Sequence, residues 1–250
     1  MPNAEPPALD TVLQRVADVD GWMTDGQAAA LYEAAAACPP AGTIVEIGSF
    51  RGRSTIVLAS AAPSDARIYA IDPHAGNDRG PREIDGYADE ADDDHQVFFA
   101  NLQAAGVADR VTHLRMFSDA AHDAVDGSID VLYIDGAHRY GPARTDIMSW
   151  GARVRDGGTL LIHDSFSSVG VTTAIARELL AGRRFRYVGR SRSLAIYRAD
   201  LEAGDRWNNG ARQAAQFPWF ARNVALKAAL VCGMGRALER TGRVAPEWPY

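Results

Sequence analysis

Hydrophobic and polar positions divide the chain into two parts with different periodicity. Up to residue 40, apolar positions recur at helical spacing over 9–19 and 25–37, which predicts two helices. Beyond it, short apolar runs alternate with helical stretches. The strands expected are 43–47, 67–71, 111–115, 129–135 and 159–163, and the helices 53–62, 93–105, 118–124, 142–154 and 169–181.

Strands that alternate with helices at this spacing are joined by crossover connections. We therefore expect an α/β fold with a doubly wound, mainly parallel sheet. Two further strands, 184–189 and 193–198, are close enough in sequence to form an antiparallel hairpin at the sheet edge and bring the total to seven. The expected organisation is N-terminal helices over 1–40, the sheet domain over 41–200 and a C-terminal extension over 201–250.

Composition excludes several classes of protein. Apolar residues make up 47% and charged residues 23%, as in globular chains. A net charge of −6 without a basic face argues against a nucleic-acid binder. No apolar run is long enough to span a membrane, and the N-terminus lacks a leader pattern, so we expect a cytoplasmic protein. Lys227 is the only lysine, which excludes a P-loop or Schiff-base lysine earlier in the chain.

The first strand ends in a glycine-containing turn that leads into a helix. Gly48 and Gly52 flank Ser49, Phe50 and Arg51, and Ser54 lies in the first helical turn. Glycine lets the backbone approach a ligand, and a helix N-terminus offers free N–H groups. Phe50 stands where a dinucleotide fingerprint has its second glycine, which disfavours a pyrophosphate. The alternative is an ordinary strand-to-helix turn.

The next two strands end in residues that suit a nucleoside. Asp72 ends the second strand, where a carboxylate can accept hydrogen bonds from ribose hydroxyls. Ser118 follows the third strand and is either an adenine contact or a helix cap. Together with the glycine turn, Asp72 predicts a nucleoside ligand.

The fourth and fifth strands end in Asp135 and in His163-Asp164. Carboxylate oxygens and an imidazole nitrogen that meet at one sheet edge predict a site for Mg²⁺ or Mn²⁺. The alternative for His163 is an oriented neutral histidine beside the site. His138 lies three residues past Asp135, and its ordinary pKa of about 6.5 suits a general base. The alternatives are a plain turn at Asp135 and a surface loop at His138.

These motifs resemble those of the class I S-adenosylmethionine-dependent methyltransferases, which have a Rossmann-like fold. VEIGSFRGRST and YAIDPH resemble the first two motifs of that fold, and YIDGAHRY and GGTLLIHDSF resemble motifs of its metal-dependent O-methyltransferases. The DGAHRY and HDS elements are most similar to the macrocin O-methyltransferase group, which modifies sugar hydroxyls, and within it to methylmannose polysaccharide O-methyltransferases. The resemblance covers about residues 41–200.

The resemblance implies a role for each matching position. It places Glu46, Gly48 and Ser49 at the methionine part of the cofactor, Asp72 at the ribose and Ser118 at the adenine. We expect Ser54 to be a further cofactor-binding residue and Asp135 to bind both cofactor and metal. The resemblance implies metal binding by Asp135, His163 and Asp164, although the position of His163 is more often acidic in relatives. The catechol branch has a lysine base where this chain has His138.

Two segments lie outside the motifs. Residues 72–94 carry glycines, a proline and many acids, and are either a lid at the ligand edge or a solvated loop; Arg79, Arg82 and Tyr87 are candidate sugar contacts there. The extension contains a predicted helix with apolar positions at Val224, Leu230, Val231, Met234 and Leu238. It is expected to pack on the domain, on a second subunit of a homodimer, or on a membrane surface.

The expected function is methylation of a hydroxyl on a sugar, oligosaccharide or glycosylated metabolite, with S-adenosylmethionine and Mg²⁺ or Mn²⁺. The first alternative is a catechol or phenolic acceptor. Alternatives from other classes are a nicotinamide-dependent dehydrogenase, which Phe50 and a missing third glycine disfavour, and a non-catalytic nucleoside-binding protein.

Overall fold

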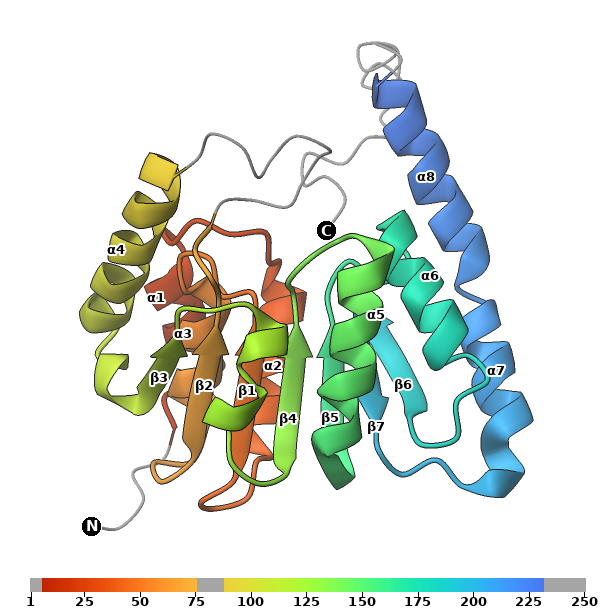
Figure 1. The fold of residues 1–250 in the computed structure, drawn as a ribbon, viewed down its shortest axis with the longest axis horizontal. Coiled ribbons are helices and arrows are strands. Elements are labelled where there is room, and N and C mark those ends of the chain that lie inside the picture. Colours follow the sequence, from red (N-terminus) through yellow and green to blue (C-terminus); the bar gives the residue numbers. More distant parts are fainter. Residues whose placement is uncertain (1–5, 76–87, 232–250) are drawn as a thin grey trace.

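A seven-stranded sheet forms the centre of the protein, which we describe from a computed structural model over residues 6–75 and 88–231 (Figure 1). The strands are β1 (Thr43–Ile47), β2 (Arg67–Ile71), β3 (Val111–Leu114), β4 (Ile129–Ile134), β5 (Val154–Ile162), β6 (Arg186–Ser191) and β7 (Leu194–Arg198). The α-helices are α1 (Leu9–Val16), α2 (Asp25–Ala36), α3 (Arg53–Ala61), α4 (Ala88–Ala104), α5 (Tyr140–Ser149), α6 (Val169–Glu178), α7 (Arg206–Ala214) and α8 (Phe217–Val231).

The strand order is β3-β2-β1-β4-β5-β7-β6, which confirms the expected topology. Strands β1 to β5 are parallel to their neighbours, whereas β7 runs antiparallel to both β5 and β6. The chain leaves β1 toward β2 on one side and later places β4 on the other. The carboxyl ends of β1 and β4 therefore flank a crevice, the usual position for a ligand in such a sheet.

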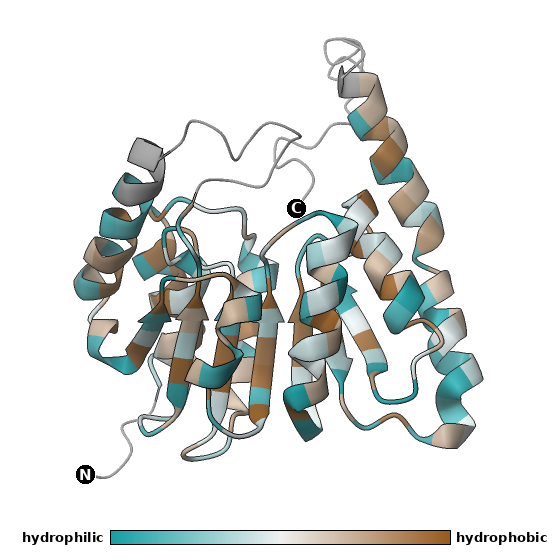
Figure 2. Ribbon diagram, viewed as in Figure 1, coloured by the Kyte–Doolittle hydropathy of each residue, from teal (hydrophilic) through white to brown (hydrophobic). Residues whose placement is uncertain are grey.

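Two hydrophobic cores cover the two faces of the sheet, because successive side chains of a strand point to opposite faces. In β4, Val131 and Tyr133 face a core shared with helices α1 to α4. Leu132 and Ile134 face a second core shared with α5 and α6. Figure 2 shows the hydrophobic colour concentrated along the buried strands.

Some element boundaries differ from the expectation. The segment 118–124 forms two 3-10 turns, Ser118–Ala120 and His122–Ala124, and the side chain of Ser118 does not cap a helix. Strand β5 begins at Val154, where a helix was expected, because Val154 pairs with Ile129 ahead of an irregularity in the register.

The two segments outside the motifs are partly described. Helix α4 begins at Ala88, inside the expected insertion at 72–94, while residues 76–87, including Arg79, Arg82 and Tyr87, lie outside the described residues. Helix α8 contains the expected Val224, whereas Met234 and Leu238 lie outside the described range. Among the helices that the structure describes, none combines the length and apolarity needed to cross a bilayer.

Candidate active site

A cavity of about 270 Å³ opens at the carboxyl edge of the sheet. Its walls are built by the residues that come directly after the five parallel strands. These include Gly48 after β1, Asp72 and His74 after β2, Phe117 and Ser118 after β3, Asp135 and His138 after β4, and His163 and Asp164 after β5.

The turn after β1 is held against the ends of β2 and β4. Gly48 has a φ of +87°, and a Cβ at this position would lie 2.3 Å from the carbonyl oxygen of Asp135, so only glycine fits. The backbone N–H groups of Ser49 and Phe50 donate to Oδ2 of Asp72 at 2.9 and 2.8 Å, and that of His74 donates to Oδ1 at 2.8 Å. Asp72 thus shapes the turn, and a carboxylate with about four acceptor positions retains capacity for a ligand.

Other predicted cofactor residues lie behind this turn. The carboxylate of Glu46 is fully buried and accepts hydrogen bonds from the hydroxyls of Ser54 and Thr55. Burial raises the pKa of Glu46 to about 8, against the lowering effect of these two hydrogen bonds. Within the described part of the chain, Glu46, Ser49 and Ser54 are not among the residues that line the cavity, so in this arrangement they support its floor.

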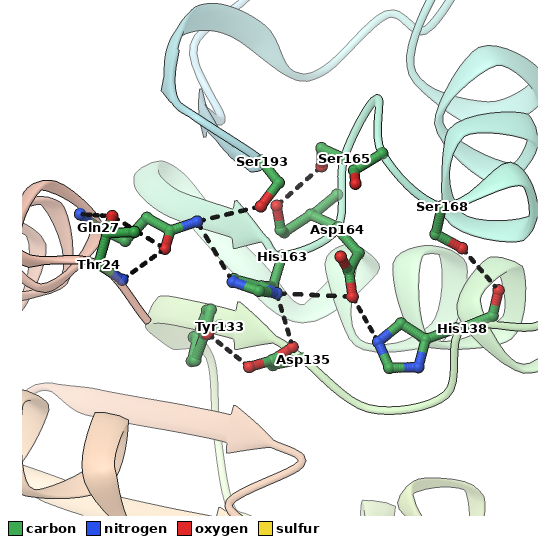
Figure 3. Close-up of polar contacts among 12 residues, drawn as sticks. Thr24, Gln27, Tyr133, Asp135, His138, His163, Asp164, Ser165, Ser168 and Ser193 are labelled. Atoms are coloured by element: carbon green, nitrogen blue, oxygen red, sulfur yellow. Dashed lines mark hydrogen bonds and ion pairs between the residues drawn. The ribbon is translucent and has the colours of Figure 1, made fainter. Parts of the chain in front are cut away.

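His163 lies between Gln27 on one side and Asp135 on the other (Figure 3). Its Nδ1 lies 3.1 Å from Oδ1 of Asp135, and its Nε2 lies 3.3 Å from Nε2 of Gln27. The Gln27 amide is oriented by Thr24, whose backbone N–H and hydroxyl donate to Oε1 at 2.8 and 3.1 Å. The Gln27 nitrogen therefore faces the ring of His163. Burial lowers the pKa of His163, but the charge of Asp135 and the hydrogen bonds with Asp135 and Asp164 outweigh burial and raise that pKa to about 10.

This network places the ring of His163 between Gln27 and Asp135. The metal-ligand role of His163 and the alternative of an oriented neutral histidine both stay predictions. Asp135 is held from a second direction by the hydroxyl of Tyr133, which donates to Oδ2 at 2.8 Å.

Asp164 and His138 form a pair at the cavity wall. Nε2 of His138 contacts Oδ2 of Asp164, whose side chain is 10% exposed. Burial raises the pKa of Asp164, but hydrogen bonds from His138 and His163 outweigh burial and hold that pKa well below its usual range. Asp164 is therefore an ionised carboxylate with little access to water, which favours a nearby cation.

Asp135, His138 and Asp164 are close enough to hold a metal ion. One potential ligand atom from each residue lies within 4.8 Å of the others. The structure thus brings together the predicted Asp135 and Asp164, with His138 where His163 was expected. Two carboxylates and one imidazole, with room for water or substrate oxygens, fit Mg²⁺ or Mn²⁺.

Asp146 is a cavity residue that the sequence did not indicate. It lies on α5, is 4% exposed, and accepts a hydrogen bond from the Ser118 hydroxyl at 2.5 Å through Oδ1. Burial raises the pKa of Asp146 to about 6, although the hydrogen bond from Ser118 opposes this shift. No motif predicts this contact, because the two residues are 28 positions apart.

Trp22 is a second unexpected contributor to the wall, from the connection between α1 and α2. Its ring lies 5.1 Å from that of Phe50, centroid to centroid. The connection is also tied to the β1 turn by Arg51, which forms ion pairs with Asp20 and, at 2.7 Å, with Asp94. The N-terminal helices therefore complete the cavity.

Comparison with known proteins agrees with this architecture. Residues 45–165 match the family model Methyltransf_24, described as a methyltransferase domain. A curated relative, the uncharacterized protein y4gI of Sinorhizobium fredii (strain NBRC 101917 / NGR234), is 27% identical over 127 residues. These residues are 49% of this chain and only 13% of the relative, so the chain spans a small part of that protein's length.

Solved structures share the fold at low sequence identity. The O-methyltransferase NovP is 17% identical, with a TM-score of 0.57 over 72% of this chain and 83% of that one. The O-methyltransferase TomG from Streptomyces achromogenes, solved in complex with SAM, is 19% identical, with a TM-score of 0.51 over 81% and 93% of the two chains. These likenesses show the fold, which is Rossmann-like with an antiparallel edge hairpin, as in the methyltransferase structures above.

Proposed function

We propose that this protein transfers a methyl group from S-adenosylmethionine to a hydroxyl of a sugar, an oligosaccharide or a glycosylated metabolite. The observation that carries the proposal is the cavity at the carboxyl edge. It combines the predicted nucleoside contacts Asp72 and Ser118 with the predicted reaction centre at Asp135, His138 and Asp164.

The charge of the cavity favours a cationic nucleoside over a dinucleotide. Among the described residues of the wall, five carboxylates face one guanidinium, that of Arg139; the acids are Asp72, Asp94, Asp135, Asp146 and Asp164. A pyrophosphate would meet like charges here, whereas a sulfonium and an ammonium group would meet opposite ones. The dehydrogenase alternative is therefore disfavoured, and the structural neighbour TomG was solved with SAM.

Each residue has a proposed part in the reaction. Asp72 and Ser118 hold the nucleoside, and Gly48 permits the close approach of the β1 turn. Asp135 and Asp164 hold a divalent cation, which when bound supplies a Lewis acid to the acceptor hydroxyl. His138 takes the hydroxyl proton while the acceptor oxygen bonds to the methyl carbon and the carbon–sulfur bond of the sulfonium breaks.

A second role for His138 has a specific observation behind it. Its imidazole belongs to the group of atoms that could hold the cation, and a metal-bound nitrogen cannot also accept a proton. His138 as base predicts that His138→Ala loses turnover but binds Mn²⁺ normally. His138 as ligand predicts that the same variant loses Mn²⁺ affinity.

We place the acceptor beside Trp22, Phe50 and Asp94, which line the cavity with two aromatic rings and a carboxylate. Aromatic rings bordered by hydrogen-bonding groups recognise ligands that have both apolar and polar edges. The same rings suit a phenolic acceptor. If the protein methylates catechol but no mono- or oligosaccharide, the proposed acceptor is a phenol and not a sugar. Cytoplasmic location and a homodimer remain predictions from the sequence.

The deciding experiment is calorimetric titration of metal-stripped protein with S-adenosylhomocysteine, with and without Mg²⁺, and with NAD⁺ in parallel. We expect binding of S-adenosylhomocysteine alone. Binding of NAD⁺ alone would overturn the methyltransferase proposal. Binding of S-adenosylhomocysteine without turnover on any acceptor would favour the non-catalytic nucleoside-binding alternative.

A further inference from the structure

The turn that presents Asp164 has an unfavourable backbone conformation. Asp164 and Phe166 have φ values of +54° and +56°, in the left-handed region that side chains with a Cβ seldom adopt. Such a conformation persists only where surrounding contacts stabilise it. Ser165 supplies two of them, since its N–H donates to the carbonyl of Ser193 and its hydroxyl to that of Ile162, each at 2.8 Å.

Helix α8 supplies further contacts to this turn. The side-chain amide of Asn223 donates to the carbonyl oxygen of Phe166 at 3.2 Å. The ammonium of Lys227 donates to the carbonyl oxygen and hydroxyl of Ser167 at 3.2 and 3.3 Å. Asn223, Phe166 and Ser167 are all at most 2% exposed, so these groups exchange little with water.

The contacts lie along one side of α8. Phe217, Phe220, Asn223 and Lys227 are three or four positions apart, the spacing of a single helix face. The ring of Phe217 lies 6.2 Å from that of Phe166, and Phe220 packs against the core beside the turn. Arg222, the neighbour of Asn223, is exposed and lies off this face.

Lys227 is the only lysine of the chain, and the other 25 of its 26 Lys and Arg residues are arginines. An ammonium is a compact charge with three donors, whereas a guanidinium is a planar fork. The compact group suits the two Ser167 oxygens at the end of a half-buried side chain. Its positive charge also interacts with the carboxylate of Asp164.

We infer that Asn223 and Lys227 are positioning residues that hold the 164–168 turn so that the carboxylate of Asp164 faces the cation site. The inference rests on the proposed function, in which Asp164 binds a divalent cation. It assigns an active-site task to α8, which lies beyond the segment that matches the family model.

The test is calorimetric titration with Mn²⁺ of the full chain and of four variants. Lys227→Met and Asn223→Ala remove the contacts, Lys227→Arg keeps charge and donors, and Arg222→Ala is the matched control on the same helix. Loss of a group that orients a ligand typically weakens metal binding about 10–100-fold. We expect a loss of this size for the first two variants, a smaller loss for Lys227→Arg, and no change for Arg222→Ala.

S-adenosylhomocysteine is titrated into the same proteins to separate the outcomes. A folded variant binds it as the wild type does, since the nucleoside contacts lie at β2 and β3. Unchanged Mn²⁺ affinity in Lys227→Met and Asn223→Ala overturns the inference alone. If the wild type binds S-adenosylhomocysteine but no Mn²⁺, both the proposed metal site and this inference are overturned. A wild type that binds Mn²⁺ but no S-adenosylhomocysteine overturns the methyl-donor proposal, and the Mn²⁺ comparison still decides the inference. If Lys227→Met does not fold, Asn223→Ala decides it.

Discussion

Replacing Asp146 by asparagine is expected to stabilise the protein at alkaline pH. The Asp146 carboxyl is 4% exposed, and burial raises its pKa from 3.8 to about 6. Asparagine has the same shape and still accepts the hydrogen bond from the Ser118 hydroxyl through its oxygen. The substitution therefore removes a buried charge without opening a cavity.

The sign and size of the effect depend on the pKa. A carboxyl whose pKa is higher in the folded than in the unfolded state favours folding while it is protonated, and this advantage is lost as pH rises through the folded pKa. Below about pH 3 the carboxyl of Asp146 is largely neutral in both states. Above about pH 6 its charge costs about 3 kcal/mol, at 1.36 kcal/mol for each pKa unit. Asparagine has no such cost at any pH.

Thermal unfolding followed by circular dichroism at pH 4 and pH 8 measures this difference. At pH 8 we expect Tm of Asp146→Asn to exceed that of the wild type by roughly 6–12 °C, since 1 kcal/mol shifts Tm by about 2–4 °C at this chain length. At pH 4, close to the unfolded pKa, the difference should shrink to about 1–2 °C. Asp119→Asn, which changes an exposed carboxylate next to Ser118, is the control and should stay close to the wild type at both values. An equal Tm difference at pH 4 and pH 8 would refute the reasoning.

Three further predictions concern the site. Gly48→Ala should destabilise the fold by more than about 3 kcal/mol, because a Cβ there would lie 2.3 Å from the carbonyl oxygen of Asp135; Gly106→Ala, with a similar φ but open space, should cost only about 1–2 kcal/mol in denaturant unfolding. Gln27→Met should cost about 2–4 kcal/mol in the same assay, since it removes the capping box of α2 and leaves buried partners unsatisfied; no loss would contradict the network. His138→Ala should lower turnover at least about tenfold while S-adenosylhomocysteine binding in calorimetry is kept, and equal turnover would exclude His138 as the base.

The sheet could be predicted because each strand has a local pattern. The apolar run at 129–135 predicts a buried strand. The short separation in sequence between 184–189 and 193–198 predicts the edge hairpin. The residues after the strands could then be assigned to one edge, which is why the cavity contains Asp72, Asp135, His138 and Asp164 as expected. Periodicity was less useful at 118–124, where the side chain of Ser118 is directed toward Asp146 instead of capping a helix.

The partners of these residues could not be predicted, because they come from distant segments. Gln27 reaches His163 across 136 positions, and their side-chain nitrogens lie 3.3 Å apart. The sequence shows a histidine at the end of a strand, but it does not show that a glutamine amide oriented by a helix cap lies behind this histidine. A spacing rule identifies the residues at the end of a strand and contains nothing about the side chains that pack behind them.

The support of the reaction centre comes largely from outside the segment that matches the methyltransferase model. Gln27 and Ser193, which hold His163 and the 164–168 turn, lie before residue 45 and after residue 165, and the cavity residue Trp22 also precedes residue 45. The matched segment provides the strand ends and their carboxylates, which the proposed methyl transfer would use. The orientation of those carboxylates and the shape of the acceptor wall depend on the flanking segments. Two chains that share the matched segment but differ in these flanks are therefore expected to share the methyl donor and to differ in acceptor and metal affinity.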